Sequence, residues 1–314
     1  MNIVFFGSDN FAVSSLRALV GRGHSISCVV TQPDKKGGRG LGIKATAIKL
    51  TALELGFEVY QPKRIDTAES IKFLKSLNPE IFVVIAYGQL LPQGVLDIPK
   101  VFSINVHASL LPRYRGAAPM NWAIIKGEAT TGITVIKMTE KMDAGPVILQ
   151  EDTAIDKFDT CISLEEKLAK LASEALIESL KSIEDKTYKL TEQDKNEASF
   201  APKLKKQDGL IAWDKPAQEI YNLIRGCLGW PGAFTYYKGK LLKIYRGRVS
   251  GPEAGSSSPG EIIKVSKEGI VVACARDSLL IEELQIEGKK KMGAAEFISG
   301  HKINLKDILG YPAP

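Results

Sequence analysis

The chain has 314 residues, more than one domain usually holds, so its length favours two domains. Hydrophobic residues make up 44% and charged residues 25% of the chain, which is typical of globular proteins with a full core and excludes a disordered chain. The net charge is +6, and residues 203–314 hold 18 Lys and Arg against 12 Asp and Glu, so the whole excess lies in the last third.

Two further classes are disfavoured by sequence patterns. No apolar run approaches the roughly 18 residues that span a bilayer, and residues 2–7 predict a buried strand rather than a targeting peptide. We therefore expect a cytoplasmic protein without membrane association. The cysteines are far apart in the sequence, which favours buried thiols over disulfides or a metal knuckle; they are Cys28, Cys161, Cys227 and Cys274.

The first 184 residues alternate short β-branched runs with helical patterns. Strands are predicted at 2–7, 25–32, 57–62, 80–87, 102–109, 132–139 and 145–155. Helices are predicted at 11–23, 46–56, 68–78 and 163–183, where apolar residues recur at three- to four-residue spacing. This alternation predicts an α/β domain over residues 1–184, with a Rossmann-like, open and mostly parallel sheet.

The second part of the chain follows a different pattern. Periodicity fades and charge rises in residues 185–207, which predicts a linker. After a short helix at 216–227, strands are expected at 233–239, 240–249, 260–274 and 278–288. Short strands divided by turn residues at this spacing predict a small, OB-like β-barrel over residues 208–314.

The strand at 102–109 carries two polar residues of chemical interest. Asn105 and His107 project from the same face because side chains alternate along a strand. A turn rich in Pro and Gly follows, so both residues lie at the carboxyl end of the strand, where open α/β sheets bind ligands. Asp143 follows another predicted strand, and we expect it at the same edge of the sheet.

An amide, an imidazole and a carboxylate at one edge suit acyl transfer from a carrier to an amine. Asn105 would stabilise the oxygen that gains charge, and His107 would carry the proton between the two nitrogens. Asp143 would orient the imidazole or a bridging water. The alternative is a structural role, because histidines at strand ends and asparagines before turns are common.

Other chemistries fit the sequence less well. The chain has three histidines and none has paired ligand spacing, which disfavours a metal site. It lacks the G-x-S-x-G motif of a serine nucleophile. A nucleotide-binding oxidoreductase would need a G-x-G-x-x-G frame after the first strand, where this chain has Gly-Ser-Asp-Asn-Phe-Ala.

The stretches INVHASLLPRYRGAAP at 104–119 and TGITVIKMTEKMDAG at 131–145 resemble the signature of the folate-dependent formyltransferases. The Asn, His and Asp of that family match Asn105, His107 and Asp143. The resemblance extends from residue 2 to about residue 310 and is greatest to members that act on tRNA, through segments at 29–40, 79–92 and 208–234.

This resemblance implies the substrates and further site residues. The implied donor is 10-formyltetrahydrofolate, without a metal, and the implied acceptor is the α-amine of methionine on initiator tRNA. Two loops are implied to bind the folate: Ser109, Leu110, Leu111 and Pro112 line its site, and Tyr87, Gly88, Gln89 and Leu90 wall the pterin pocket.

Basic residues in both parts of the chain are candidates for tRNA contact. Arg39 matches a family arginine that helps to recognise the tRNA end, and it lies in a Gly-rich segment, expected to be mobile, with Lys35, Lys36 and Lys44. In the predicted barrel the candidates are Arg246, Arg248, Lys289, Lys290 and Lys291. The alternative for all of these residues is a solvated surface.

Two functional alternatives remain open, and we expect a monomer in each case. The same core chemistry could serve a small acceptor such as glycinamide ribonucleotide or an amino sugar nucleotide, although these acceptors do not explain a basic barrel. A non-catalytic tRNA-binding protein is the other alternative, and the presence of Asn105, His107 and Asp143 argues against it.

Overall fold

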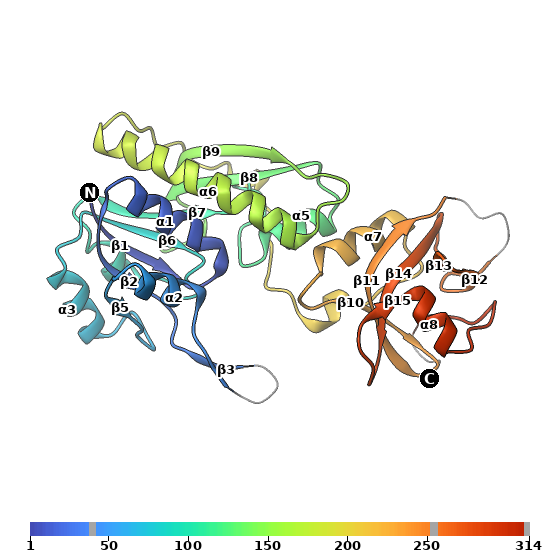
Figure 1. Cartoon of the computed structure of the whole chain (residues 1–314). Helices are drawn as coiled ribbons and strands as arrows, with labels where there is room; N and C mark the ends of the chain where they lie inside the picture. The colour runs from blue at the N-terminus through green and yellow to red at the C-terminus, as the bar shows by residue number, and fades with distance from the viewer. Residues whose placement is uncertain (38–41, 252–256, 311–314) are drawn as a thin grey trace. The chain divides into compact units, whose positions relative to one another are not determined.

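The computed structural model describes residues 1–37, 42–251 and 257–310 and divides the chain into two compact units (Figure 1). Unit 1 comprises Met1–Pro119, Thr130–Ala154 and Glu165–Pro202. Unit 2 comprises Met120–Ala129, Ile155–Leu164 and Lys203–Pro314. Most of the segment with linker-like composition, up to Pro202, therefore belongs to unit 1.

Unit 1 is built on a seven-stranded sheet with the order β5-β2-β1-β6-β7-β8-β9. The strands are β1 (Asn2–Gly7), β2 (Ser25–Val30), β5 (Val59–Tyr60), β6 (Ile81–Ile85), β7 (Phe102–His107), β8 (Thr130–Lys137) and β9 (Val147–Ala154). The first five are parallel to one another, whereas β8 pairs antiparallel with both β7 and β9. The prediction of an open, mostly parallel sheet is confirmed.

The helices of unit 1 agree with the helical periodicity of the sequence. They are α1 (Val13–Gly21), α2 (Ala47–Glu54), α3 (Ala68–Ser76), α4 (Gln93–Leu96), α5 (Pro119–Ile125) and α6 (Cys161–Glu184), the last two extending into unit 2. Thr46 and Thr67 cap α2 and α3 because each hydroxyl accepts a hydrogen bond from a backbone N–H in the first turn. The short helices α4 and α5 have too few periodic positions to be predicted from the pattern.

One face of this sheet positions the candidate site. Side chains at alternate positions of β1, β2 and β6 form a buried cluster with α3, which includes Val4, Phe6, Cys28, Val30, Leu74, Phe82, Val84 and Tyr87. Val84 of β6 pairs with Asn105 of β7. Asn105 therefore lies on the same face as this cluster, near the carboxyl ends of both strands.

Unit 2 contains an antiparallel sheet with the order β10-β11-β14-β13-β12, with β15 paired to β14. The strands are β10 (Ala233–Tyr237), β11 (Lys240–Val249), β12 (Ile262–Ser266), β13 (Gly269–Ala273), β14 (Ser278–Ile286) and β15 (Met292–Gly293), and the helices are α7 (Ala217–Gly226) and α8 (Ala294–Gly300). The core includes Ile220 and Ile224 of α7 and Phe297 of α8.

Residues 306–310 connect the two edge strands of this sheet. The backbone N–H of Leu309 donates to the carbonyl oxygen of Gly260 before β12 (2.7 Å), and that of Gly310 donates to Tyr236 of β10 (3.0 Å). These bonds close the sheet, so the expected barrel-like domain is present. Within the three described ranges, no helix combines the length and the apolar composition that a membrane span requires.

Candidate active site

Asn105, His107 and Asp143 meet on the face of the sheet at β7. The Nδ2 of Asn105 donates to Oδ1 of Asp143 (3.3 Å), and the Nδ1 of His107 lies 3.6 Å from Oδ2 of the same carboxylate. The His107 and Asp143 side chains are only 7% and 11% exposed, so little water screens the interaction between them. The structure thus brings together the three residues that the sequence selects.

The orientation of the His107 ring is set by a residue that sequence reasoning missed. The Nε2 of His107 lies 3.0 Å from the carbonyl oxygen of Tyr114. A carbonyl oxygen only accepts hydrogen bonds, so Nε2 carries a hydrogen and Nδ1 faces Asp143. Tyr114 has a positive φ of 60° and its N–H donates to Ser199 Oγ (2.9 Å), which fixes the carbonyl group beside the ring.

Asp143 reaches the site by a different route from the one the sequence suggests. Because β8 is antiparallel to β7, the loop after β8 starts beside the amino-terminal end of β7, where the Met138 N–H donates to Ser103 O (2.8 Å). The loop then folds back along the sheet face. Asp143 has a φ of 52°, and its Oδ2 accepts a hydrogen bond from the Gly116 N–H (2.9 Å).

The turn after β7 packs tightly against residues 199–201. The Arg115 N–H donates to Ser199 O (2.8 Å) and the Ala201 N–H donates to Arg115 O (2.7 Å). At Gly116, with a φ of 125°, a Cβ atom would lie 2.6 Å from Ala201 O. This position therefore requires glycine, and the segment with linker-like composition forms one wall of the site.

The candidate folate loop at 109–112 is held by Thr134 of β8. The Thr134 Oγ1 donates to Ser109 O (2.6 Å) and accepts from the Leu111 N–H (3.0 Å). The Ser109 hydroxyl donates to Arg113 O (2.6 Å), so this side chain stabilises the loop itself. Leu110 and Pro112 are partly exposed, whereas Leu111 is buried.

The second candidate folate loop, 87–90, has two side chains engaged within the protein. Tyr87 is buried against Phe6, and burial raises the pKa of its hydroxyl well above the usual value. Gln89 accepts a hydrogen bond from the Ile65 N–H (3.2 Å). Gly88 is exposed and Leu90 is 65% exposed, so these two residues form the open surface of the loop.

The basic segment of unit 1 forms a hairpin of β3 (Lys35–Gly37) and β4 (Gly42–Lys44). Lys35 pairs with Lys44 and both are exposed, while Lys36 pairs with Ile43 through the backbone. Arg39 lies outside the described residues. Two like charges therefore lie opposite each other on an exposed hairpin.

Several basic candidates of unit 2 have acidic neighbours. Arg246 and Arg248 share an exposed face of β11, and the Nε of each lies within 3.6 Å of Glu282. The Lys291 Nζ lies 2.6 Å from Glu283 and that of Lys290 lies 3.9 Å from Glu296. Lys289 is exposed, and its backbone groups bond within the turn. The charge at these positions is thus partly compensated.

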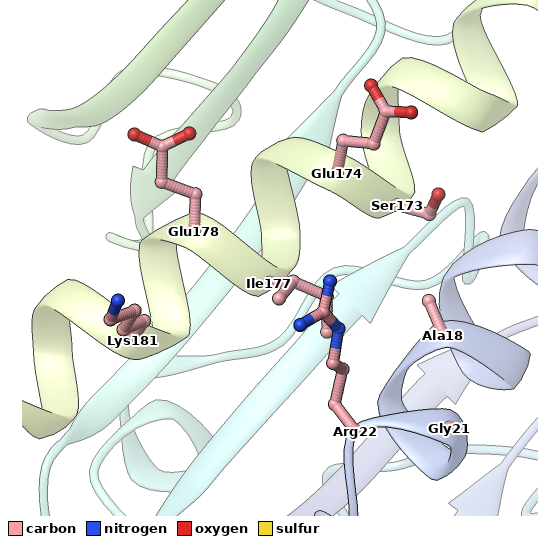
Figure 2. Close-up of a pocket in the computed structure, with 8 residues that line it drawn as sticks. All are labelled: Ala18, Gly21, Arg22, Ser173, Glu174, Ile177, Glu178 and Lys181. Atoms are coloured by element: carbon pink, nitrogen blue, oxygen red, sulfur yellow. The ribbon is translucent and has the colours of Figure 1, made fainter.

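A surface cavity of about 580 Å³ lies away from these residues, between α1 and α6 (Figure 2). Figure 2 shows the Arg22 side chain reaching towards α6 near Ile177. The residues that line the cavity are Ala18, Gly21, Arg22, Ser173, Glu174, Ile177, Glu178 and Lys181. Among the residues that the structure describes, no group of three or more His, Cys, Asp or Glu side chains converges as a metal site requires.

Comparisons with known proteins cover almost the whole chain. Residues 1–180 match the family described as formyl transferase, and residues 203–302 match the formyl transferase C-terminal domain. The methionyl-tRNA formyltransferase of Geotalea uraniireducens is 44% identical over 310 residues, which are 99% of this chain and 98% of that protein. The enzyme of the same name from Caldanaerobacter subterraneus is 45% identical, over 98% of this chain and 100% of its own.

Solved structures share the fold at much lower identity. HypX from Aquifex aeolicus in complex with tetrahydrofolic acid has a TM-score of 0.64 at 18% identity, over 97% of this chain and 50% of its own. The N-formyltransferase from Helicobacter canadensis, in complex with folinic acid and dTDP-3-aminofucose, has a TM-score of 0.68 at 19% identity, over 92% and 99%. By its family matches and its full-length relatives, this chain belongs to the methionyl-tRNA formyltransferase family.

Proposed function

We propose that the chain transfers the formyl group of 10-formyltetrahydrofolate to the α-amine of methionine on initiator tRNA. The observation that carries this proposal is the convergence of Asn105, His107 and Asp143 in a chain with full-length relatives of that name. The folate ligands of the solved relatives support a folate donor.

The transfer takes place directly between two nitrogens. The lone pair of the methionine amine forms a bond to the formyl carbon, and the carbonyl π electrons move onto the oxygen. The tetrahedral intermediate then collapses, the bond from carbon to the folate N10 breaks, and N10 takes up a proton while the amine loses one. No covalent bond to the protein is needed.

Each of the three side chains has one role in this sequence of steps. The Asn105 amide has two hydrogens, one directed at Asp143, and the other donates to the developing oxyanion, an effect worth about 10²- to 10³-fold. His107 moves the proton, worth roughly 10²- to 10⁴-fold. His107 Nδ1 and Asp143 Oδ2 lie 3.6 Å apart. An amine or a water can therefore lie about 2.9 Å from both atoms and hydrogen-bond to each of them.

The folate ring system would bind between the two loops already described. Because the side chains of Gln89 and Ser109 bond within the protein and that of Tyr87 is buried, the loops contact the pterin through backbone groups. Gly88 and Leu110 offer the accessible surface. This arrangement is consistent with a planar ligand that carries its own hydrogen-bonding groups.

The tRNA would bind mainly through exposed basic residues. We assign contacts with phosphates or the end of the acceptor stem to Lys35 and Lys44, which pair in the exposed hairpin, and, from the sequence, to Lys36 and Arg39 of the same segment. In unit 2 we assign this role to Arg246, Arg248 and Lys289–Lys291. Several of these residues form ion pairs with Glu282, Glu283 or Glu296, and these ion pairs must rearrange, or share the charge with the phosphates, when tRNA binds.

We place the reaction in the cytoplasm, where aminoacylated initiator tRNA is used. We also expect a monomer to suffice, because Asn105, His107, Asp143 and Tyr114 come from one chain.

An acceptor assay tests this function. The protein is incubated with labelled 10-formyltetrahydrofolate and either initiator methionyl-tRNA, glycinamide ribonucleotide or a dTDP-amino sugar. We expect a blocked methionine amine and at least a hundredfold lower kcat/KM for the small amines. Preference for a small amine would assign the chain to a small-molecule formyltransferase, and binding of tRNA without transfer would reduce it to a binding protein.

A further inference from the structure

Gln193 connects two parts of the site from within the segment of linker-like composition. Two residues earlier, Thr191 pairs with Val147 at the start of β9 through two backbone hydrogen bonds of 2.8 and 2.9 Å. This pairing directs the Gln193 side chain inward, where it is only 8% exposed. Because this amide is buried within an otherwise exposed, charge-rich segment, its surroundings select for glutamine at position 193.

The Gln193 amide has all of its hydrogen-bonding groups in use. Its Nε2 donates to the carbonyl oxygens of Asp143 (2.9 Å) and Gly145 (2.7 Å). Its Oε1 accepts from the Nε (3.1 Å) and Nη2 (2.6 Å) of Arg115. The reverse orientation would place an oxygen against two carbonyl groups and an NH₂ group against a guanidinium, so only one orientation is possible.

These contacts hold Asp143 in an unfavourable backbone conformation. A φ of 52° is uncommon for a residue with a side chain and persists only where the surroundings enforce it. Gln193 holds the Asp143 carbonyl group, while the Gly116 N–H holds its carboxylate. Because Arg115 and Gly116 are adjacent, Gln193 ties the main chain of Asp143 to the same turn that binds the Asp143 carboxylate.

We propose that Gln193 is a positioning residue for formyl transfer, which places the Asp143 carboxylate beside His107 and Asn105 without contacting the reacting atoms itself. The inference rests on the proposed function, because it assumes that Asp143 acts in the transfer. Misplacing a participating group by about 1 Å can cost on the order of 10²-fold in rate, so the loss should fall on kcat.

Gln193→Met tests the role, since it keeps the side-chain length and removes all four hydrogen bonds. We expect kcat to fall about 10- to 100-fold while KM for donor and tRNA stays within about threefold. Asn196→Leu is the matched control, because it removes an amide from an exposed position of the same segment, and it should leave kcat unchanged. An unchanged kcat in Gln193→Met, or an equal rise in both KM values from general loosening, would overturn the proposal.

Gln193→Glu separates the two sides of the amide. It keeps an oxygen for Arg115 but turns a second oxygen towards the carbonyl groups of Asp143 and Gly145, which repel it. We expect a loss of kcat at least equal to that of Gln193→Met. Wild-type kcat in this variant would show that Gln193 serves Arg115 rather than Asp143.

A double-mutant cycle with Asp143→Asn shows whether Gln193 acts through Asp143. If it does, adding Gln193→Met to Asp143→Asn lowers the single-turnover rate by less than about twofold, whereas independent effects multiply. Multiplied losses would overturn the positioning role. Wild-type protein in the same assay keeps the two proposals apart: failure of wild type to formylate methionyl-tRNA contradicts the proposed function, and full activity of Gln193→Met contradicts only this inference.

Discussion

Gly145 is the residue at which the backbone around the site is most crowded. A Cβ atom there would lie 1.8 Å from the carbonyl oxygen of Lys137, a contact that the loop can relieve only by moving. We predict that Gly145→Ala displaces Asp143, lowers kcat at least tenfold and costs about 1–3 kcal/mol of stability. Kinetics and thermal unfolding of the variant measure both effects.

The control for this loop is Met142→Ala, which truncates a side chain that is 54% exposed. It should leave kcat and stability close to those of wild type. If Gly145→Ala behaves like Met142→Ala, the close approach of the loop to Lys137 does not position Asp143.

The sequence was sufficient to select Asn105 and His107 but not the residues that hold them. The alternation of a strand is local, so two polar residues two positions apart must share a face. Tyr114 and Gln193 act through a backbone carbonyl group and a long-range amide contact, and neither leaves a spacing pattern. Asp143 was expected beside them because it follows a predicted strand, and the family signature agrees, but the route of its loop depends on the antiparallel direction of β8.

At the scale of elements, the 109–112 loop is held by the Thr134 hydroxyl of β8 and by the Gln150 amide of β9, which donates to Leu111 O (3.0 Å). Thr134→Val keeps the shape of the side chain but leaves the Ser109 carbonyl group and the Leu111 N–H without this partner, at about 1–3 kcal/mol per buried group. We predict that KM for the folate donor rises about tenfold while KM for tRNA changes little. The exposed Thr130 of the same strand, as Thr130→Val, is the control. A donor KM equal to that of the control would exclude this loop from folate binding.

The closure of the barrel-like sheet makes its stability depend on pH. The Tyr237 hydroxyl donates to Asp307 Oδ2 (2.7 Å) and the Lys238 ammonium lies 2.9 Å away, which lowers the pKa of Asp307 from 3.8 to about 2. A lowered folded-state pKa gives stability that is full above the unfolded value of 3.8 and is lost as pH falls towards 2.

We therefore predict that Asp307→Asn lowers the Tm of the chain at pH 7, and that its difference from wild type shrinks between about pH 4 and pH 2. Unfolding followed across this range measures the difference. Asp214→Asn changes an exposed carboxylate in the same unit and should have little effect at any pH. A difference for Asp307→Asn that stays constant from pH 7 to pH 2 would show that its charge does not stabilise the closure.

Elements with a strong period were predicted and short ones were not. Most strands of both sheets and helices α1, α2, α3, α6 and α7 lie within the predicted segments, although the single strand expected at 260–274 divides into β12 and β13 and the two-residue strand β15 was not expected. The β3–β4 hairpin, α4, α5 and α8 are too short for such a pattern, and the pairing of residues 306–310 with both edge strands is a long-range contact. Charge-rich residues 187–201 are ordered through backbone bonds that composition does not encode.

For the whole molecule, we expect the distribution of charge to govern binding of the proposed tRNA substrate. The excess of six positive charges lies in residues 203–314, although several of its members face glutamates. We predict that tRNA affinity falls with salt, with a log–log slope of about −0.7 to −0.9 per phosphate contact. Donor affinity in the same salt series is the control and should change much less. A tRNA affinity that does not change with salt would show that these basic residues do not contact the tRNA.

The chemical step itself is tested most directly by the single-turnover rate of formyl transfer to initiator methionyl-tRNA in Asn105→Ala. Loss of the donor to the oxyanion should lower that rate at least a hundredfold, with the Kd of both substrates within about threefold of wild type. A rate close to wild type with both substrates bound would contradict the role of Asn105, and with it the assignment of this site to formyl transfer.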